Sequence, residues 1–145
     1  MLVRLAREHE IDTIADIYVA SFRGLTFLPR LHSDEEMRDW VRRVMAPGHE
    51  VSVGEMDGRL VGFASLRDGL LGHFYVHPDA QGRGVGSALL ENVKLERPEG
   101  FELWVFQRND RARRFYERHG CRLIELTDGS DNEECEPDAR YEWRP

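Results

Sequence analysis

The chain has 145 residues, 41% of them hydrophobic and 10% aromatic, which is the size and composition of a globular domain with a core of its own. Its formal net charge of −7 argues against a nucleic-acid partner, which a basic surface would hold, and suits a small cationic one. Cys121 and Cys135 form no CxxC pair and no Cys/His cluster with zinc spacing, so we expect no bound metal and free thiols in a reducing compartment.

The amino-terminal sequence MLVRLAREHE carries charges where a secretion signal needs an apolar run. No stretch approaches the roughly 18 apolar residues of a membrane span. We therefore expect a cytoplasmic protein without membrane contact. Because we find no linker and no internal repeat, we expect one domain over residues 1–145.

The first part of the chain predicts a strand and two helices. Residues 2–6 alternate between apolar and other side chains and predict a short strand. Apolar residues recur at helical spacing over residues 10–22 and 34–45, which predicts two amphipathic helices. Ser33 and Glu36 form the capping-box pattern at the start of the second helix.

A break at residues 46–48 ends the second helix, and an antiparallel meander follows it. Asp57-Gly58 and Asp68-Gly69 are dipeptides typical of the two-residue turns of β-hairpins. They join three stretches with strand character, residues 50–56, 59–67 and 70–76. The meander leads the chain directly into a glycine-rich turn.

The remaining elements alternate between helix and strand. We expect helices over residues 87–95 and 110–119, and strands over residues 101–106, 121–126 and 139–143. The order β-α-α-β-β-β-α-β-α-β-β predicts the α/β (α+β) fold class, with a mixed, mostly antiparallel central sheet of about seven strands and helices on both faces.

The turn sequence QGRGVG, residues 81–86, is the most informative stretch of the chain. Glycines before a helix let backbone N–H groups approach a phosphate, and the helix dipole favours an anion there. The spacing is neither the GxGxxG of dinucleotide-binding folds nor the GxxxxGK[ST] of a P-loop. The feeding strands, the helix that follows and Arg83 within the turn favour a phosphate site over a turn whose glycines serve backbone geometry alone.

This turn resembles the (Arg/Gln)-x-x-Gly-x-(Gly/Ala) motif of the GNAT superfamily of N-acetyltransferases, with VHP before it and SALL after it. The resemblance implies a GNAT-like sheet, acetyl-CoA as cosubstrate, and the coenzyme pyrophosphate on the amides of the turn. The turn residues implied to bind the coenzyme are Gln81, Gly82, Arg83, Gly84, Val85, Gly86 and Ser87. It also implies that Phe74, Tyr75 and Val76 offer their main chain to the pantetheine arm.

A second stretch, NDRARRFYERHGC, reads locally as a well-capped helix, with Asn109 as its N-cap and Gly120 at its end. It is also similar to the second GNAT signature, Asn-x-x-Ala-x-x-Phe-Tyr-Glu-x-x-Gly-Cys. That similarity implies that Asn109 contacts the pantetheine and that Tyr116 stands near the sulfur. Attack of an amine on a thioester expels a thiolate, and a tyrosine hydroxyl can protonate it. We predict Tyr116 as the catalytic residue, the alternative being a half-buried helix tyrosine.

The attacking amine must also lose its proton, which costs a lysine-like amine about 4.6 kcal/mol at pH 7. A general base would help, but the sequence does not choose among several side chains. The candidates are His73, Tyr75, Glu102, Glu133 and Glu134.

In GNAT relatives two loops generally frame the acceptor pocket, and the matching segments here are residues 23–33 and 127–140. The first carries Arg23, Arg30, His32, Phe27 and Leu28, and the second carries Asp128, Asp131, Glu133, Glu134 and Asp138. The basic groups suit a carboxylate and the acidic ones suit an ammonium, so we predict an amino-acid-like or peptide amine. The alternative is a solvated acidic loop.

We therefore predict an acetyl-CoA-dependent N-acetyltransferase that transfers an acetyl group directly to a primary amine of a small molecule, amino acid or peptide, without a cysteine-bound intermediate. The resemblance also allows a homodimer. A non-catalytic acyl-CoA sensor is the main alternative, although the presence of both Asn109 and Tyr116 argues against it. A generic nucleotide-phosphate protein is disfavoured by the glycine spacing.

Overall fold

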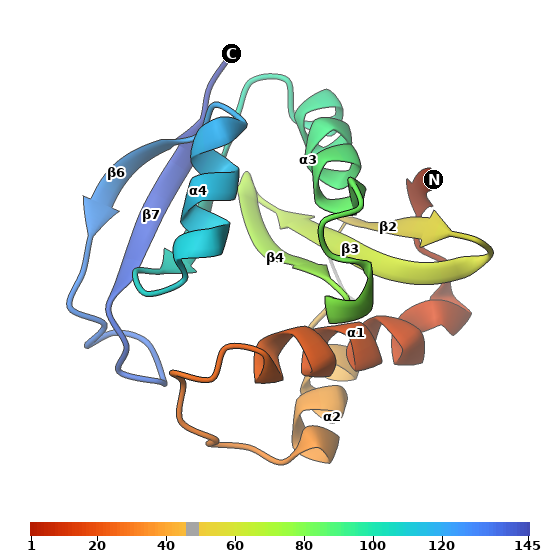
Figure 1. Ribbon diagram of the computed structural model, residues 1–145, viewed down its shortest axis with the longest axis horizontal. Coiled ribbons are helices and arrows are strands. Elements are labelled where there is room, and N and C mark those ends of the chain that lie inside the picture. Colours follow the sequence, from red (N-terminus) through yellow and green to blue (C-terminus); the bar gives the residue numbers. More distant parts are fainter. Residues whose placement is uncertain (46–49) are drawn as a thin grey trace.

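A computed structural model describes residues 1–45 and 50–145, and within them the chain has the predicted mixed α/β fold (Figure 1). Seven strands of this described part form one sheet in the order β1-β2-β3-β4-β5-β7-β6, and only β4 and β5 are parallel neighbours there. No helix of the same residues is long and apolar enough to cross a bilayer. The break predicted at residues 46–48 lies outside the described residues.

The strands are β1 (Leu2–Leu5), β2 (Glu50–Met56), β3 (Arg59–Arg67), β4 (Leu70–Val76), β5 (Phe101–Phe106), β6 (Arg122–Leu126) and β7 (Asp138–Trp143). The α-helices are α1 (Ile11–Arg23), α2 (Asp34–Val44), α3 (Val85–Glu96) and α4 (Asp110–Arg118), and short 3-10 helices cover η1 (Glu8–Glu10) and η2 (Pro78–Ala80). The predicted ends differ most at α3, which begins at Val85 rather than at residue 87. The reason is that Gly84, with a φ of 86°, serves as the N-cap and lets the helix start immediately after it.

The predicted turns and caps form as the local sequence indicates. Asp57 and Gly58 have φ values of 54° and 77°, and Asp68 and Gly69 have values of 51° and 79°. Two successive positive values are what a type I′ hairpin turn requires. Before α2, the Ser33 hydroxyl accepts a hydrogen bond from the Glu36 amide at 3.1 Å, and the Glu36 carboxylate accepts one from the Ser33 amide at 2.9 Å.

Helices cover both faces of the sheet, as predicted, with α1 and α2 on one face and α3 and α4 on the other (Figure 1). The core under α1 and α2 contains Ile14, Ile17, Val41, Met45, Val53 and Phe63. The core on the other face contains Val61, Val85 and Leu89, together with Leu90, Val93, Leu103, Tyr116 and Tyr141. The apolar spacing of the helices is therefore explained by burial against the sheet.

The sheet opens between β4 and β5. These parallel strands pair only through the first residues of β4, Leu70 and Leu71. A bulge follows at Gly72, because the register with β3 passes from Leu71 directly to His73. A bulge bends its strand and increases its twist. Beyond Gly72 the strand therefore diverges from β5, and the edge of β4 that faces β5 is left without a neighbouring strand (Figure 1).

Candidate active site

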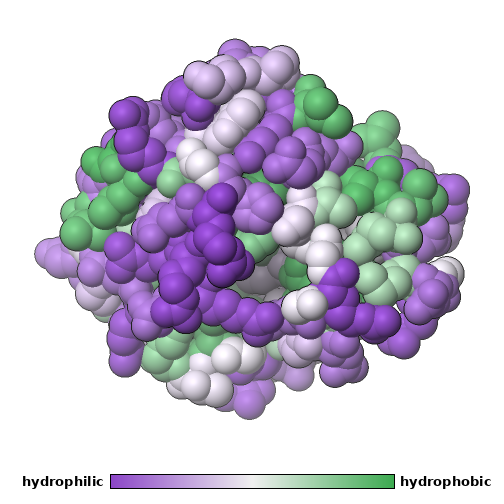
Figure 2. Space-filling view, turned by 45° about the horizontal axis from the view of Figure 1, so that its top comes forward, coloured by the Kyte–Doolittle hydropathy of each residue, from purple (hydrophilic) through white to green (hydrophobic). Residues whose placement is uncertain are grey.

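The opening between β4 and β5 leads into a cleft of about 1680 Å³. Its walls come from both strands, the glycine turn, α4, and the loops that follow α1 and β6. Figure 2 shows a hollow near the middle of the molecule, with strongly hydrophilic residues on its left and residues of intermediate to hydrophobic character on its right. The volume exceeds that of most small-molecule sites, so the cleft has room for an extended ligand and a second reactant.

The glycine turn presents bare backbone to this cleft. Gly82 and Gly84 line it, and nothing lies within 4 Å of the position that a Cβ would take at either residue. In the described part of the chain, the N–H groups of residues 82–87 donate to no acceptor, and the first bond into α3 runs from the Ala88 amide to the Gly84 carbonyl at 3.1 Å. Consecutive unpaired amides at a helix N-terminus form a ready binding site for an anion such as a phosphate.

The other residues of the turn have separate structural roles. A Cβ at Gly86 would lie 3.3 Å from the Phe115 ring, so this glycine allows α3 and α4 to pack closely. Val85 is buried in the core, and Arg83 is exposed. Ser87 lines the cleft, and its hydroxyl is 3.1 Å from Nε2 of His119.

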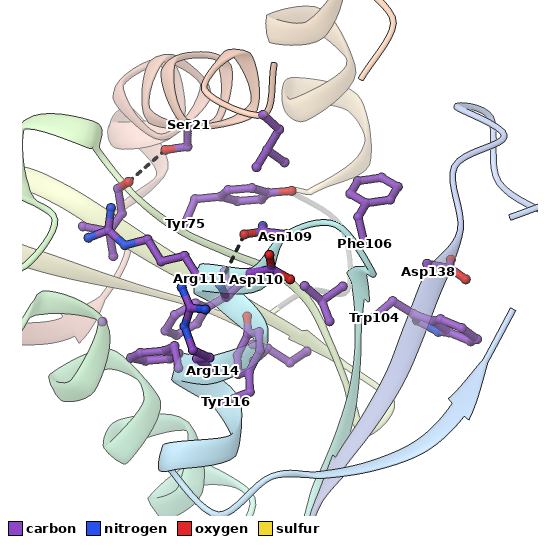
Figure 3. Close-up of a pocket in the computed structure, with 18 of the residues that line it drawn as sticks. Ser21, Tyr75, Trp104, Phe106, Asn109, Asp110, Arg111, Arg114, Tyr116 and Asp138 are labelled. Atoms are coloured by element: carbon purple, nitrogen blue, oxygen red, sulfur yellow. Dashed lines mark hydrogen bonds between the residues drawn. The ribbon is translucent and has the colours of Figure 1, made fainter. Parts of the chain in front are cut away.

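Gln81 joins the turn to the elements beside it. Its side-chain amide donates to the Val76 carbonyl at 3.1 Å and accepts from Nη1 of Arg111 at 2.6 Å. The Val76 carbonyl accepts a further hydrogen bond from the Ser21 hydroxyl at 3.0 Å, drawn in Figure 3. The end of β4, the glycine turn, α1 and α4 are thus held together where the cleft begins.

The main chain of β4 alternates between β3 and the cleft. The His77 amide donates to the Val61 carbonyl at 2.7 Å. In an antiparallel pair the backbone groups of every second residue face the partner strand, so the N–H and C=O of Tyr75, two residues before His77, also face β3. The N–H and C=O groups of Phe74 and Val76 point the other way, toward the opening. The main chain of Tyr75 is therefore engaged with β3, while this residue still lines the cleft.

Asn109 combines a capping role with a place in the cleft. Its Oδ1 accepts a hydrogen bond from the Ala112 amide at 3.2 Å, which makes it the N-cap of α4 (Figure 3). Its side-chain NH₂ group has no acceptor among the described residues, and Asn109 lines the cleft. One oxygen therefore stabilises the helix, and two N–H donors are left for a ligand.

Tyr116 lies on the cleft side of α4, below Asn109 in Figure 3. Its ring is 7% exposed and packs near the rings of Phe74 and Phe115, with centroids 6.0 and 5.4 Å away. Its hydroxyl forms no hydrogen bond with the part of the chain that the structure describes. Burial raises the pKa of Tyr116 well above its usual value, so the hydroxyl stays protonated at neutral pH and can donate.

Neither cysteine forms a disulfide. Cys121 is buried behind α4, and its amide donates to the Tyr116 carbonyl at 2.9 Å. Burial raises the pKa of its thiol to about 11, so the thiol stays protonated at neutral pH. Cys121 is a poor nucleophile in this position.

The five candidates for a general base lie in different surroundings. Nδ1 of His73 lies 3.1 Å from the Ser65 hydroxyl, and Glu102 forms an ion pair with Arg140. The Tyr75 ring packs edge-on against Tyr18, with centroids 5.3 Å apart. Burial is the main cause of a strongly raised pKa at Tyr75. The hydroxyl of Tyr75 therefore stays protonated at neutral pH and is a poor candidate for the base.

The remaining candidates, Glu133 and Glu134, lie in the loop between β6 and β7. Glu133 contacts His32 across the molecule. Glu134 is partly buried, and burial together with the Glu133 carboxylate raises its pKa above the usual range. Burial raises the pKa of Tyr18 to about 12, with smaller contributions from the Glu134 and Glu133 carboxylates.

The basic groups of the loop after α1 are engaged with their own neighbours. Arg23 binds Asp34 at 2.9 Å and donates to the His32 carbonyl, and Arg30 lies 3.5 Å from the same aspartate. His32 contacts Glu133. The structure thus brings the two predicted loops together, but it uses their cations internally rather than leaving them open to a ligand.

Sequence reasoning missed two residues that shape this region. Arg108 contacts the buried carboxylate of Glu136 and also donates to the Phe27 carbonyl at 3.2 Å. Asn132 holds the loop before β7 in shape, because its side chain donates to the Glu136 carbonyl at 2.8 Å and accepts from the Glu136 amide at 3.1 Å. Neither residue belongs to a sequence motif, and contacts between loops produce no periodic pattern in the sequence from which they could be predicted.

Comparisons with known proteins identify the family of this chain. A family model for the acetyltransferase (GNAT) domain matches residues 47–121. An uncharacterized N-acetyltransferase of Archaeoglobus fulgidus is 30% identical over 149 aligned residues, covering 92% of this chain and 100% of the relative. The peptidyl-lysine N-acetyltransferase YiaC of Escherichia coli is 29% identical over 126 residues, covering 86% of this chain and 85% of the relative.

A solved structure is also similar. The structure of yncA from Salmonella typhimurium with its cofactor acetyl-CoA matches 99% of this chain and 93% of that chain with a TM-score of 0.77. The sequence identity is 20%, so this likeness concerns the fold.

Proposed function

Because this chain belongs to the GNAT family of acetyltransferases, we propose that it is an acetyl-CoA-dependent N-acetyltransferase that transfers an acetyl group directly to a primary amine. We further propose that residues 1–145 act as one catalytic domain. One observation carries the proposal: within the described residues, one cleft is lined both by Gly82, Gly84, Gly86 and Ser87, whose amides are unpaired, and by Tyr116, whose hydroxyl makes no hydrogen bond. An anion site and a proton donor in one cleft suit a phosphate-bearing thioester.

The described residues fit such a coenzyme along the length of the cleft. The amides of residues 82–87 would hold its pyrophosphate, since Gly82 and Gly84 leave the approach open. The Val76 carbonyl is occupied by Ser21 and Gln81, so the N–H and C=O of Phe74 and the N–H of Val76 are the groups on the edge of β4 that would pair with the amides of its pantetheine arm. The side-chain NH₂ of Asn109 offers a further donor in the same cleft.

Tyr116 would act as the general acid. Acetyl-CoA supplies an activated acetyl thioester. The ammonium ion first gives up a proton to water, and the neutral amine then attacks the carbonyl carbon. The C–N bond forms, the C–S bond breaks so that the sulfur leaves as an anion, and the nitrogen loses its second proton to water to give the neutral amide. The protonated Tyr116 hydroxyl donates to that sulfur as charge develops, because burial keeps the phenol neutral. The buried thiol of Cys121 is not ionised, which favours direct transfer over a cysteine-bound intermediate.

The acceptor that this site suits best is an amine that arrives as an ammonium ion. Arg23, Arg30 and His32 are engaged with neighbouring groups, so no free cation of this set remains to anchor a carboxylate. Asp131, by contrast, lines the cleft without a partner among the described side chains. We therefore place a lysine-like side chain of a peptide or a small cationic amine ahead of a free amino acid.

A thiol-release assay with acetyl-CoA and a panel of amines tests this function. The panel contains a lysine peptide, a diamine and free amino acids, and the enzymes are wild type, Tyr116→Phe and Tyr18→Phe. Tyr18 is a matched control because its hydroxyl also makes no hydrogen bond with any residue that the structure describes, and it does not line the cleft. We expect Tyr116→Phe to lower kcat about 100-fold and Tyr18→Phe to leave kcat near the wild-type value.

Calorimetric titration with acetyl-CoA accompanies the assay. Unchanged coenzyme affinity in Tyr116→Phe, with lost turnover, would support the proposed role of the hydroxyl. Tight binding of acetyl-CoA by the wild type without turnover of any amine in the panel would instead favour the non-catalytic acyl-CoA sensor.

A further inference from the structure

Three arginines of α4 form a row along one wall of the cleft. Arg111, Arg114 and Arg118 are three and four residues apart, so they share one face of the helix, and all three line the cleft. Figure 3 shows Arg111 and Arg114 on the cleft side of α4. From Arg111 to Arg118 the helix rises about 10 Å.

The positive charges of this row are not neutralised within the described part of the chain. Arg114 and Arg118 form no hydrogen bond or ion pair there, and Arg111 contacts only the neutral amide of Gln81 at 2.6 Å. Asp110 also lines the cleft, four residues before Arg114, yet it forms no ion pair with it. By contrast, Arg113 of the same helix donates to the Tyr141 hydroxyl at 3.0 Å and to the Gln107 carbonyl at 3.3 Å.

This arrangement is unusual for an acidic protein. The chain has 27 acidic residues against 20 lysines and arginines. With so many carboxylates available, most arginines form an ion pair, as Arg108 does with Glu136. Unpaired arginines that gather in one cleft produce a local positive field that attracts an anion.

Contacts at both ends set the row beside the glycine turn. At one end Arg111 binds Gln81, which begins the turn, and at the other Nε2 of His119 lies 3.1 Å from the hydroxyl of Ser87, in the first turn of α3. Gly82, Gly84, Gly86 and Ser87, whose amides are unpaired among the described residues, line the same cleft. The cleft therefore offers two separate anion sites side by side, one made of backbone amides and one made of guanidinium groups.

We propose that the arginine row binds the 3′-phosphate of the coenzyme ribose, so that the protein distinguishes CoA from 3′-dephospho-CoA. This inference rests on the proposed function, in which the amides of the turn hold the pyrophosphate. A phosphate monoester carries close to two negative charges at pH 7, and arginine binds it through paired N–H donors. The pyrophosphate occupies the backbone site, so the second phosphate of the same ligand is the group left for the guanidinium site.

The test compares the affinities of CoA and 3′-dephospho-CoA by calorimetric titration. The proteins are wild type, the double variant Arg114→Gln/Arg118→Gln, and the control Arg43→Gln/Arg59→Gln. Both pairs are exposed and unpaired among the described residues, so each double variant removes the same charge and should remain folded. Circular dichroism and the Tm confirm folding.

We expect the wild type and the control to bind CoA about 30-fold more tightly than 3′-dephospho-CoA. The row variant should lose most of that preference by weakening CoA binding, while its affinity for 3′-dephospho-CoA stays within about twofold of wild type. The salt dependence of CoA binding should also become shallower in this variant alone.

Equal affinity of the wild type for both nucleotides would overturn the inference and leave the proposed function standing. A preference that persists in the row variant would overturn it too, because another group would then recognise the 3′-phosphate. If neither nucleotide binds to the wild type, the inference and the proposed function both fail.

Discussion

The guanidinium of Arg108 lies 4.9 Å from the centre of the Phe27 ring, although 81 residues separate the two in the chain. The same side chain contacts the buried carboxylate of Glu136 in the loop before β7. Arg108 thus connects the loop after α1 to the loop after β6, the two segments that frame the proposed acceptor side of the cleft. Loops that are tied together hold a pocket in one shape, which lowers the entropic cost of binding.

Replacing Arg108 with alanine should loosen both loops and leave Glu136 without its cation. We expect a loss of about 1–2 kcal/mol in the free energy of unfolding, since the arginine is more exposed than its partner. The KM for the amine acceptor should rise several-fold, whereas the Kd for acetyl-CoA should not change. Steady-state kinetics and titration calorimetry check this, with Arg59→Ala as the control. An unchanged acceptor KM would show that the loops do not frame the acceptor.

Two substitutions at Asn109 separate its capping role from ligand binding. Aspartate keeps an oxygen that accepts from the Ala112 amide but has no side-chain N–H, so Asn109→Asp should preserve stability and weaken acetyl-CoA binding about tenfold. Asn109→Ala removes both functions and should also cost about 1 kcal/mol of stability. Urea unfolding and calorimetry measure the two effects. Equal coenzyme affinity for Asn109→Asp and the wild type would restrict Asn109 to capping.

Gly84→Ala should weaken acetyl-CoA binding by more than its effect on folding explains. Gly84 has a φ of 86° and open space around its Cβ position, and so does Gly58, with a φ of 77° in the turn between β2 and β3. Alanine at either site should cost about 1 kcal/mol of stability from backbone strain. Only at Gly84 would the new methyl group stand where the coenzyme approaches. Equal losses of affinity in the two variants would contradict a coenzyme site on the glycine turn.

Folding stability should fall in acid because of Glu10. Nη1 and Nη2 of Arg4 bind its two oxygens at 2.9 and 2.7 Å, and the Arg7 amide donates to it at 2.7 Å. The hydrogen bonds from Arg4 are the main cause that lowers the pKa of Glu10 from 4.5 to about 2. The unfolded chain therefore binds the proton more readily, and the stabilisation is complete above about pH 5 and is lost as the pH falls toward 2.

Urea unfolding across that pH range measures this effect in the wild type and in Glu10→Gln. The difference in unfolding free energy between them should be at most about 3 kcal/mol at neutral pH and should shrink as the pH approaches 2. Glu8→Gln, a change at a neighbouring exposed carboxylate, serves as the control. A difference that does not depend on pH would show that the charge of Glu10 is not what stabilises the fold.

Much of the fold could be predicted because its signals are local. The Asp-Gly turns set the ends of β2, β3 and β4 at the predicted residues, and the Ser33–Glu36 capping box sets the start of α2. The glycine turn, Asn109 and Tyr116 were also visible, because each belongs to a short motif. The start of α3 was placed too late, since the φ of Gly84 depends on the three-dimensional path of the turn rather than on helix propensity.

The sequence by itself therefore determined the order of strands and helices, the family and the side chains of the motifs, since hydrogen bonds and packing between near neighbours dictate these. Only the tertiary structure decided how β4 separates from β5 after the Gly72 bulge, and which charged groups remain free. His32 meets Glu133 while Arg114 and Arg118 remain unpaired in the described chain, because such pairings depend on which distant segments the fold brings within a few ångströms of each other.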